Sequence, residues 1–200
     1  MRGAFTQYPG DLPQTVQMNA GFIAATFDPD TGEYDDILGA TSDGITFNPN
    51  PTYEDFGADI DNVPANTWQM KRLTAYDPTA SGTFKTMTAA LAKRLLPGSD
   101  FATGSTTHII PTSTLTAADF DDIWIIGDYS DVNTGANAGF MAIHLMHAMN
   151  NTSLQWKTNK DGKADFAFEF HAHYDLTSPD TVPFEVYVKP GTAATAGGNG

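Results

Sequence analysis

Residues 165–175 read DFAFEFHAHYD, and this stretch decides the fold class. Aromatic side chains occupy every second position, at Phe166, Phe168 and Phe170, and polar side chains such as Glu169 and His171 stand between them. Successive side chains of a β-strand point to opposite faces of a sheet. This period of two therefore predicts a strand with one face buried and the other in water.

Seven further segments show β patterning on either side of this strand. They are rich in β-branched and aromatic residues, and Gly, Pro, Asp and Asn mark the turns between them. In chain order they are residues 16–27, 44–53, 70–76, 83–88, 123–126, 139–149 and 184–188. About eight strands are therefore expected.

Several of these segments carry hints of their place in a sheet. Residues 123–126 are apolar on both faces, which favours a central strand. Residues 44–53 contain two prolines, which cannot donate to a neighbouring strand, so this segment is expected at an edge or leaving the sheet. Residues 70–76 and 83–88 predict a hairpin with turns at Asp-Pro and Ser-Gly pairs, and residues 139–149 leave a helix as the alternative to a strand.

One helix is predicted, from residue 88 to residue 96. Met87, Leu91 and Leu95 recur at helical spacing, and a Pro-Gly pair ends the segment. A short helical turn, capped by a threonine, is expected at residues 117–120. Together these elements predict a mainly β fold, a sandwich or barrel of about eight strands with one flanking α-helix.

The chain divides into three parts by composition. Residues 1–15 predict an N-terminal arm, residues 16–189 a single β domain, and residues 190–200 a flexible Gly/Ala/Thr tail. Within the domain, residues 54–67 form a long polar loop between strands. Loops of this length in a compact domain tend to be functional.

Charge and composition exclude several classes of function. The formal net charge is -14, and 11 of the 24 acids lie in residues 1–65, where only Arg2 opposes them. Such a field repels nucleic acid, so a DNA-binding module is not expected. Cysteine is absent, which excludes disulfides and thiol chemistry. The N-terminus lacks the apolar run of a signal peptide, and no segment has the roughly 20 apolar residues of a membrane span, so we expect a chain made in the cytoplasm.

Motifs for catalysis or metal binding are weak. The Asp28–Gly32 run lacks the later ligands of a calcium loop. A second match fails because its first ligand position is Lys157 and its twelfth is Phe168, so we interpret both as turns. Glu169, His171 and His173 share one strand face, but no third histidine stands at a zinc-binding spacing. The adjacent carboxylates of the Asp121-Asp122 pair would point to opposite faces. No enzyme activity, cofactor or metal is expected.

The order of blocks along the chain resembles the tail tube (major tail) proteins of long-tailed bacteriophages, with the non-contractile phages as the expected type. The resemblance runs from about residue 16 to residue 189. Its blocks are the loop at 54–67, residues 81–84 leading into the helix at 88–96, residues 168–175, and residues 182–188.

The resemblance implies a β-sandwich or barrel whose subunits form rings, usually of six, that stack into a tube for viral DNA. Its partners would be other copies of the chain and the tail tip, tape measure and tail terminator proteins of a virion. The long loop and the terminal arms would join successive rings, and DNA would pass through an acidic channel without specific binding. The expected contacts between rings are Asp55, Phe56, Asp59, Ile60, Asp61, Asn62, Val63 and Pro64.

Two other classes of function compete with this one. A carbohydrate-binding sandwich on a virion surface would need exposed aromatic rings, for which Trp68, Trp124 and Trp156 are the candidates. Trp124 stands in an apolar run and is expected to be buried. A hydrolase would need a paired acid and base, and the sequence offers no such pair.

Overall fold

The computed structural model describes residues 21–102, 108–129 and 138–191. The predicted arm at 1–15, the start of the segment at 16–27 and most of the tail at 190–200 lie outside these residues. The described part is mainly β with one α-helix, as predicted. Its strands are β1 (Phe22–Phe27), β2 (Tyr34–Ile37), β3 (Thr41–Asn48), β4 (Pro51–Asp55), β5 (Lys71–Tyr76), β6 (Thr79–Phe84), β7 (Ser99–Ala102), β8 (His108–Pro111), β9 (Asp121–Asp128), β10 (Phe140–Asn150), β11 (Gln155–Lys157), β12 (Asp165–His171) and β13 (Phe184–Lys189).

The helical elements are α2 (Ala89–Leu95) and two 3₁₀ turns, η1 (Trp68–Met70) and η2 (Ala117–Asp119). The helix and the turn near residue 117 were both predicted. Thr88 caps α2, because its Oγ1 accepts a hydrogen bond from the backbone N–H of Leu91 at 3.1 Å. At η2, the Asp119 carboxylate accepts hydrogen bonds from the backbone N–H and the hydroxyl of Thr116.

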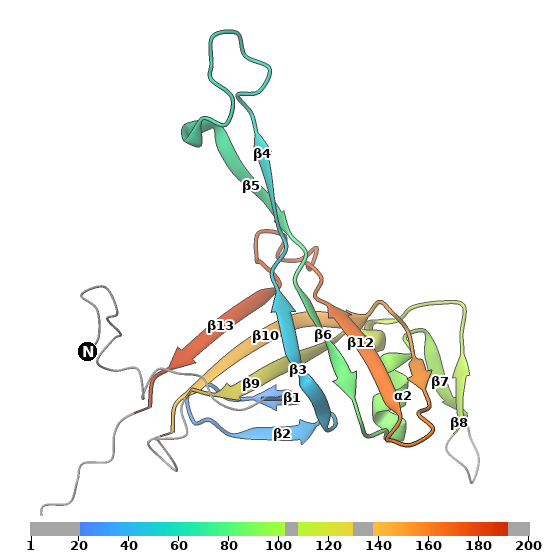
Figure 1. Cartoon of the computed structure of the whole chain (residues 1–200). Coiled ribbons are helices and arrows are strands. Elements are labelled where there is room, and N and C mark those ends of the chain that lie inside the picture. Colours follow the sequence, from blue (N-terminus) through green and yellow to red (C-terminus); the bar gives the residue numbers. More distant parts are fainter. Residues whose placement is uncertain (1–20, 103–107, 130–137, 192–200) are drawn as a thin grey trace, which may run out of the picture.

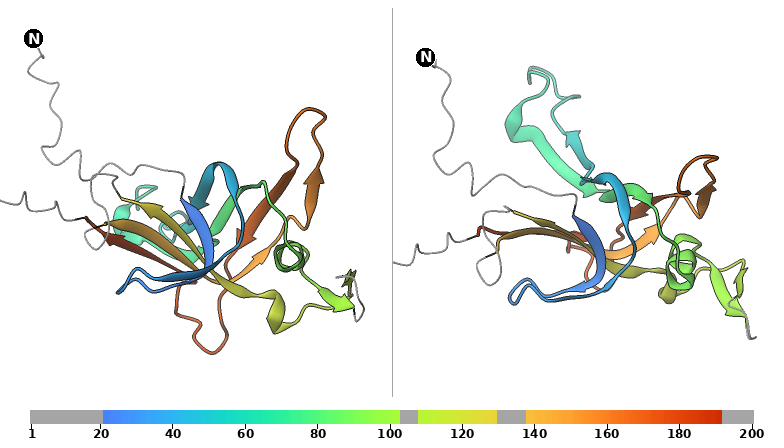
Figure 2. Two further views of the ribbon diagram at one scale, coloured as in Figure 1. Left: turned by 90° about the horizontal axis from the view of Figure 1, so that it is seen from below. Right: turned by 60° about the horizontal axis from the view of Figure 1, so that its bottom comes forward.

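Nine strands join in one antiparallel sheet that folds into two layers (Figures 1 and 2). The first layer has the order β2-β1-β9-β10-β13, and the second contains β12, β6 and β3, with β11 beside β12. Strand β10 belongs to both, because Phe140–Leu145 pairs with β9 and β13, whereas Met149 and Asn150 pair with β12. The change of layer coincides with a bulge at which His147 has a positive φ of 49°.

The core lies between the two layers and under α2, which makes the fold a β-sandwich closed by one helix. Gly82 lies opposite Phe168 in the ladder, and a Cβ atom there would come within 2.8 Å of the phenyl ring, so only glycine leaves room for that ring. The large side chains that fill the core are Ile23, Ile123, Ile143 and Leu145 of the first layer, Phe84, Phe168 and Phe170 of the second, and Leu91 and Leu95 of α2.

The predicted hairpin between residues 70–76 and 83–88 is wrong. Strand β5 pairs with β4, whereas β6 pairs with β3 and β12. The Ser-Gly pair lies inside β6 rather than in a turn, and β6 ends at Phe84. Residues 44–53, predicted as one segment, are divided at residues 49–50 into the end of β3, an edge strand as expected, and the start of β4.

The prediction of about eight strands is also too low, because the described residues hold thirteen. Most of the additional strands, β2, β7, β8 and β11, have three or four residues. Residues 140–150 form a strand and not the alternative helix, and β9 is a central strand as predicted.

Candidate interaction surface

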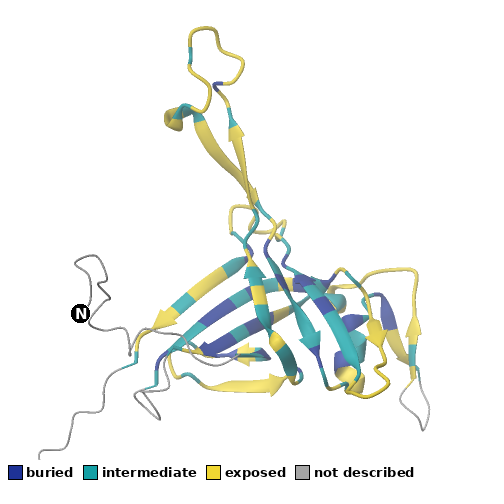
Figure 3. Cartoon of the chain, viewed as in Figure 1, coloured by how far each residue is buried: buried dark blue, intermediate teal, exposed yellow. Residues whose placement is uncertain are grey.

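The predicted long loop is the tip of a two-stranded hairpin, β4–β5, that projects from the sandwich (Figure 1). Strands β3 and β4 together run antiparallel to β5 and β6, so one long hairpin begins in the sandwich and continues beyond it. Nearly every residue of β4 and β5 is exposed, on both faces of the ribbon (Figure 3). An isolated two-stranded ribbon is marginally stable in water, so this one is expected to be covered by another molecule when it acts.

The hairpin carries an unusual amount of exposed apolar surface. Trp68 is 79% exposed and Phe56 is 53% exposed, whereas aromatic side chains of this size usually pack inside a protein core. Clustered apolar groups on a protruding element mark an interaction site. The other large exposed apolar side chains of this hairpin are Tyr53, Ile60 and Leu73.

The tip is held in one shape by its own hydrogen bonds. One carboxylate oxygen of Asp55 accepts from the backbone N–H of Gly57 at 3.0 Å, and the other accepts from that of Asn66 at 2.9 Å. The Thr67 hydroxyl donates to the Pro64 carbonyl at 2.6 Å. The loop is therefore pre-organised, which lowers the entropy lost on binding.

Seven of the eight predicted contact residues present their side chains at the surface of the tip. Asp55 differs, because both of its oxygens hold the loop together. Those on the surface are Phe56, Asp59, Ile60, Asp61, Asn62 and Pro64, which are exposed, and Val63, which is half-buried. Tyr53, Trp68 and Leu73 complete the apolar surface and were not among the predicted contacts.

The charges on the hairpin are divided between its two strands. Glu54 lies on β4 and Asp59 and Asp61 lie on the loop that follows it, whereas Lys71 and Arg72 lie on β5. Lys71 donates to the side-chain oxygen of a loop asparagine at 3.1 Å, and Arg72 donates to a backbone carbonyl of η1 at 3.0 Å. The bases are thus used inside the hairpin, and the loop acids remain available to a partner.

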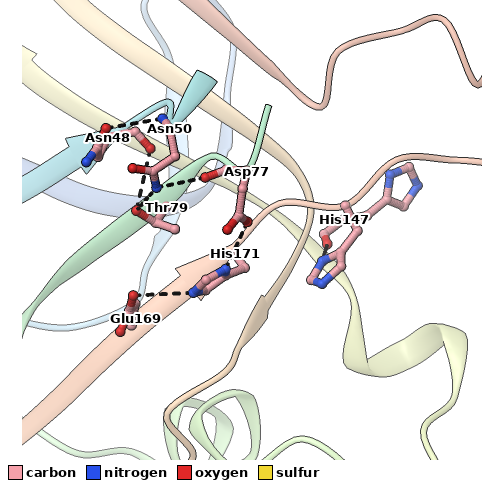
Figure 4. A network of polar contacts seen from close by, with 8 residues as sticks. Asn48, Asn50, Asp77, Thr79, His147, Glu169 and His171 are labelled. Atoms are coloured by element: carbon pink, nitrogen blue, oxygen red, sulfur yellow. Dashed lines mark hydrogen bonds and ion pairs between the residues drawn. The ribbon is translucent and has the colours of Figure 1, made fainter. Parts of the chain in front are cut away.

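A polar network fixes the hairpin where it leaves the sandwich (Figure 4). The Asn50 side chain donates to the Asp77 carbonyl at 2.9 Å and to the Thr79 hydroxyl at 3.3 Å, while its backbone N–H donates to Asn48 Oδ1 at 3.1 Å. These bonds tie together the two strands at the point where β3 passes into β4 and β5 passes into β6.

The second part of this network contains His171, one of the two histidines considered as metal ligands in the sequence. His171 Nδ1 lies 3.1 Å from Asp77 Oδ1, and its Nε2 lies 3.3 Å from Glu169 Oε1. His173 lies beyond the end of β12, and its Nδ1 is 2.9 Å from the His147 carbonyl oxygen. No three His, Asp or Glu side chains within the described ranges are placed to share a metal ion.

The two weak calcium-loop matches are turns. Asp28 Oδ1 accepts from the backbone N–H groups of Asp30 at 2.8 Å and Thr31 at 3.3 Å. These hydrogen bonds, that from Asp30 above all, lower the pKa of the Asp28 carboxyl. In the later match, the Asn159 amide donates to the Lys163 carbonyl at 2.8 Å, which closes a tight loop.

Adjacent carboxylates Asp121 and Asp122 point apart, as predicted for neighbours in a strand. Asp121 pairs with Arg94 at 3.3 Å, and Asp122 lies 3.2 Å from His144 on the other face. His144 stacks on Trp124 with ring centres 4.1 Å apart. Trp124 is only 8% exposed, which confirms that it is buried.

The sequence matches no protein-family model and no curated protein. Among the residues that the structure describes, none of the helices has the length and apolar character needed to cross a membrane. The function must therefore be inferred from the fold and from the projecting hairpin.

Proposed function

We propose that this chain is the structural subunit of a bacteriophage tail tube, which assembles into stacked rings around a channel for viral DNA. The observation that carries the proposal is the β4–β5 hairpin, a pre-organised element with apolar side chains on a tip that the rest of its own chain leaves exposed. A second copy of the chain is the partner that a tube requires.

The position of the hairpin favours an open-ended assembly over a closed dimer. Its tip projects from one end of β6, whereas the other end of β6 leads into α2. A contact between a protrusion at one end and a different surface at the other joins unlike surfaces. Such contacts do not close with two copies, and they propagate as a fibre or a tube.

The open edge of the first layer supports lateral contacts. Within the described residues, β13 pairs only with β10, and its free side offers a regular row of backbone groups. Val186 and Val188 on this strand are exposed. An uncovered regular edge strand promotes aggregation, and joining subunits in a ring, usually of six in this class, removes it.

The acidity of the chain suits a channel for DNA. With a formal net charge of -14, the protein repels phosphates, so a duplex would slide through the lumen without being held. In this proposal the protein resides in the virion, and the tail tip, tape measure and tail terminator proteins contact the tube.

A carbohydrate-binding module is the second candidate, and two exposed tryptophans favour it. Trp68 and Trp156 are both largely exposed, but one lies at the hairpin and the other on β11, and Trp124 is buried. A stacking platform needs rings on one shared surface. Glycan-array binding by the isolated subunit would favour this candidate over the tube.

Negative-stain electron microscopy over a range of protein concentrations tests the proposal. Hollow tubes or stacked rings, with a bore wide enough for a DNA duplex, are the expected result. A chain that stays monomeric at every concentration, even with tail tip complexes added as initiators, would overturn it.

A further inference from the structure

A small hollow lies beside α2. This helix and the β7–β8 ribbon are found at the same end of the body (Figures 1 and 2). It has a volume of about 150 Å³ and is lined mainly by apolar side chains, among them Ala90, Pro97, Phe101, Ala118 and Ile123. A cavity of about this volume accommodates a benzene ring in another protein. The hollow is therefore large enough for one aromatic side chain.

Two bases border this hollow, and one of them has a hydrogen-bond donor without a partner among the described residues. Arg94 lines it and pairs with Asp121 at 3.3 Å and with Asp36 at 3.8 Å, but its Nη1 is buried without a hydrogen-bond partner. Lys93 also lines the hollow, and its charge acts on the Asp119 carboxylate of the same rim. A buried donor without a partner is costly, so an acceptor brought by a ligand would be stabilised here.

The other carboxylate at the rim, that of Asp119, already accepts hydrogen bonds from its own chain. Asp119 accepts from the backbone N–H of Gly98 at 3.0 Å and from the backbone N–H and hydroxyl of Thr116 at 2.7 and 3.1 Å. It therefore holds η2 against the end of α2, and the nearby charge of Lys93 helps to lower the pKa of its carboxyl. The hollow combines an apolar interior with a buried donor, Arg94 Nη1, that has no hydrogen-bond acceptor among the described residues.

We infer that this hollow receives the hairpin tip of a second copy of the chain, with Phe56 in the hollow and Asp59 against Lys93 and Arg94. Phe56 is exposed and carries a ring of the size that the hollow fits, whereas the indole of Trp68 is larger. Asp59 follows Phe56 by one tight turn and is also exposed. This inference rests on the proposed function and names the surface that completes its contact between rings.

The geometry of one subunit agrees with this pairing. The hairpin continues one end of β6, and α2 follows the other end, so the tip and the hollow lie toward opposite ends of this strand. A tip-to-hollow contact would therefore place the next copy further along the same direction. Repetition of that step stacks subunits along an axis.

Disulfide trapping tests the pairing cleanly, because the chain contains no cysteine. The double variant Ala58→Cys/Ala118→Cys, which keeps Phe56 and uses an exposed neighbour on the tip, is assembled, oxidised and separated on a non-reducing gel. Because the contact joins unlike surfaces, each subunit links to the next, and a ladder of covalent multimers is expected rather than a single dimer band. The matched control is Ala58→Cys/Ala89→Cys, whose second cysteine lies on α2 but outside the lining of the hollow.

The outcomes separate this inference from the proposed function. A ladder at least about tenfold stronger than in the control supports the docking, since disulfides form only when the Cα atoms lie within about 7 Å. If the wild-type chain forms tubes but the variant gives no ladder, or a ladder no stronger than that of the control, the docking is overturned and the tube proposal stands. Absence of tubes from the wild-type chain would overturn both.

A charge exchange gives a second measurement that does not depend on cysteine variants assembling. Lys93→Glu should raise the concentration needed for tube formation by about tenfold, the change expected for one close charge pair at an interface. Adding Asp59→Lys to the same chain should restore most of that loss. Failure of the second substitution to rescue assembly would refute the pairing of these two positions.

Discussion

Truncation of one tip side chain, Phe56→Ala, should weaken assembly without affecting the fold of the subunit. The ring is 53% exposed in the free subunit, and burial of that part, about 100 Å² of the roughly 200 Å² of an aromatic side chain, contributes about 2.5 kcal/mol at about 25 cal/mol per Å². This free energy corresponds to about a 70-fold rise in the concentration at which tubes form.

The assay is sedimentation of tubes over a series of protein concentrations, with thermal unfolding of the monomer measured in parallel. The matched control is Trp156→Ala, which removes an even more exposed ring from β11, outside the hairpin. The unfolding temperature of Phe56→Ala should equal that of the wild type. Assembly of Phe56→Ala at the wild-type concentration would refute the reasoning, and so would an equal loss in Trp156→Ala.

Three further substitutions test the subunit itself, each by urea unfolding. Asn150→Ala should lower the free energy of unfolding by about 3 kcal/mol, because it leaves the buried carbonyl of Leu95 and the N–H of Glu169 without partners. A loss of stability no larger than that caused by a substitution at an exposed position would contradict this role. Thr88→Ala should cost about 1 kcal/mol by removing the cap of α2, and Thr88→Ser should recover most of it. Burial raises the pKa of Asp119, but three hydrogen bonds outweigh that effect and hold the pKa below the ordinary value of 3.8. Asp119→Asn should therefore lower the free energy of unfolding by about 1 kcal/mol above about pH 4. The difference in stability between the variant and the wild type should fade as the pH falls through the lowered pKa of the folded state. A difference from wild type that grows in acid would contradict the assignment.

The elements that could be predicted from the sequence are those whose own pattern reports their surroundings. The alternation of Phe166, Phe168 and Phe170 gave the half-buried strand β12, and helical spacing together with the Pro-Gly stop gave α2. Strands β2, β7 and β11 are short and largely exposed, so they have no apolar period to recognise. Their strand conformation depends on the neighbour with which each one pairs.

The hairpin was misread because its pairing is not local. Asp77-Pro78 has the composition of a hairpin turn, but the chain passes through it nearly straight from β5 to β6. The pairing is decided by β3 and β4, whose residues lie between 16 and 43 positions earlier in the chain than their partners in β5 and β6. The loop and its apolar residues could be predicted, as Phe56 and Ile60 show, whereas Tyr53 and Leu73 lie in segments predicted as strands of the domain and were not predicted as contacts.

The continuity of the hairpin with the sandwich has a mechanical consequence. The backbone of β6 runs directly into β5, so tension on the tip is transmitted along the axis of β6. Antiparallel hydrogen bonds lie perpendicular to the strands, and the ladder between β6 and β12 extends from Thr79 to Phe84. Such a pull loads these bonds together in shear and does not peel them one at a time. A subunit built in this way is suited to bear axial strain when a long filament of its copies is bent or stretched.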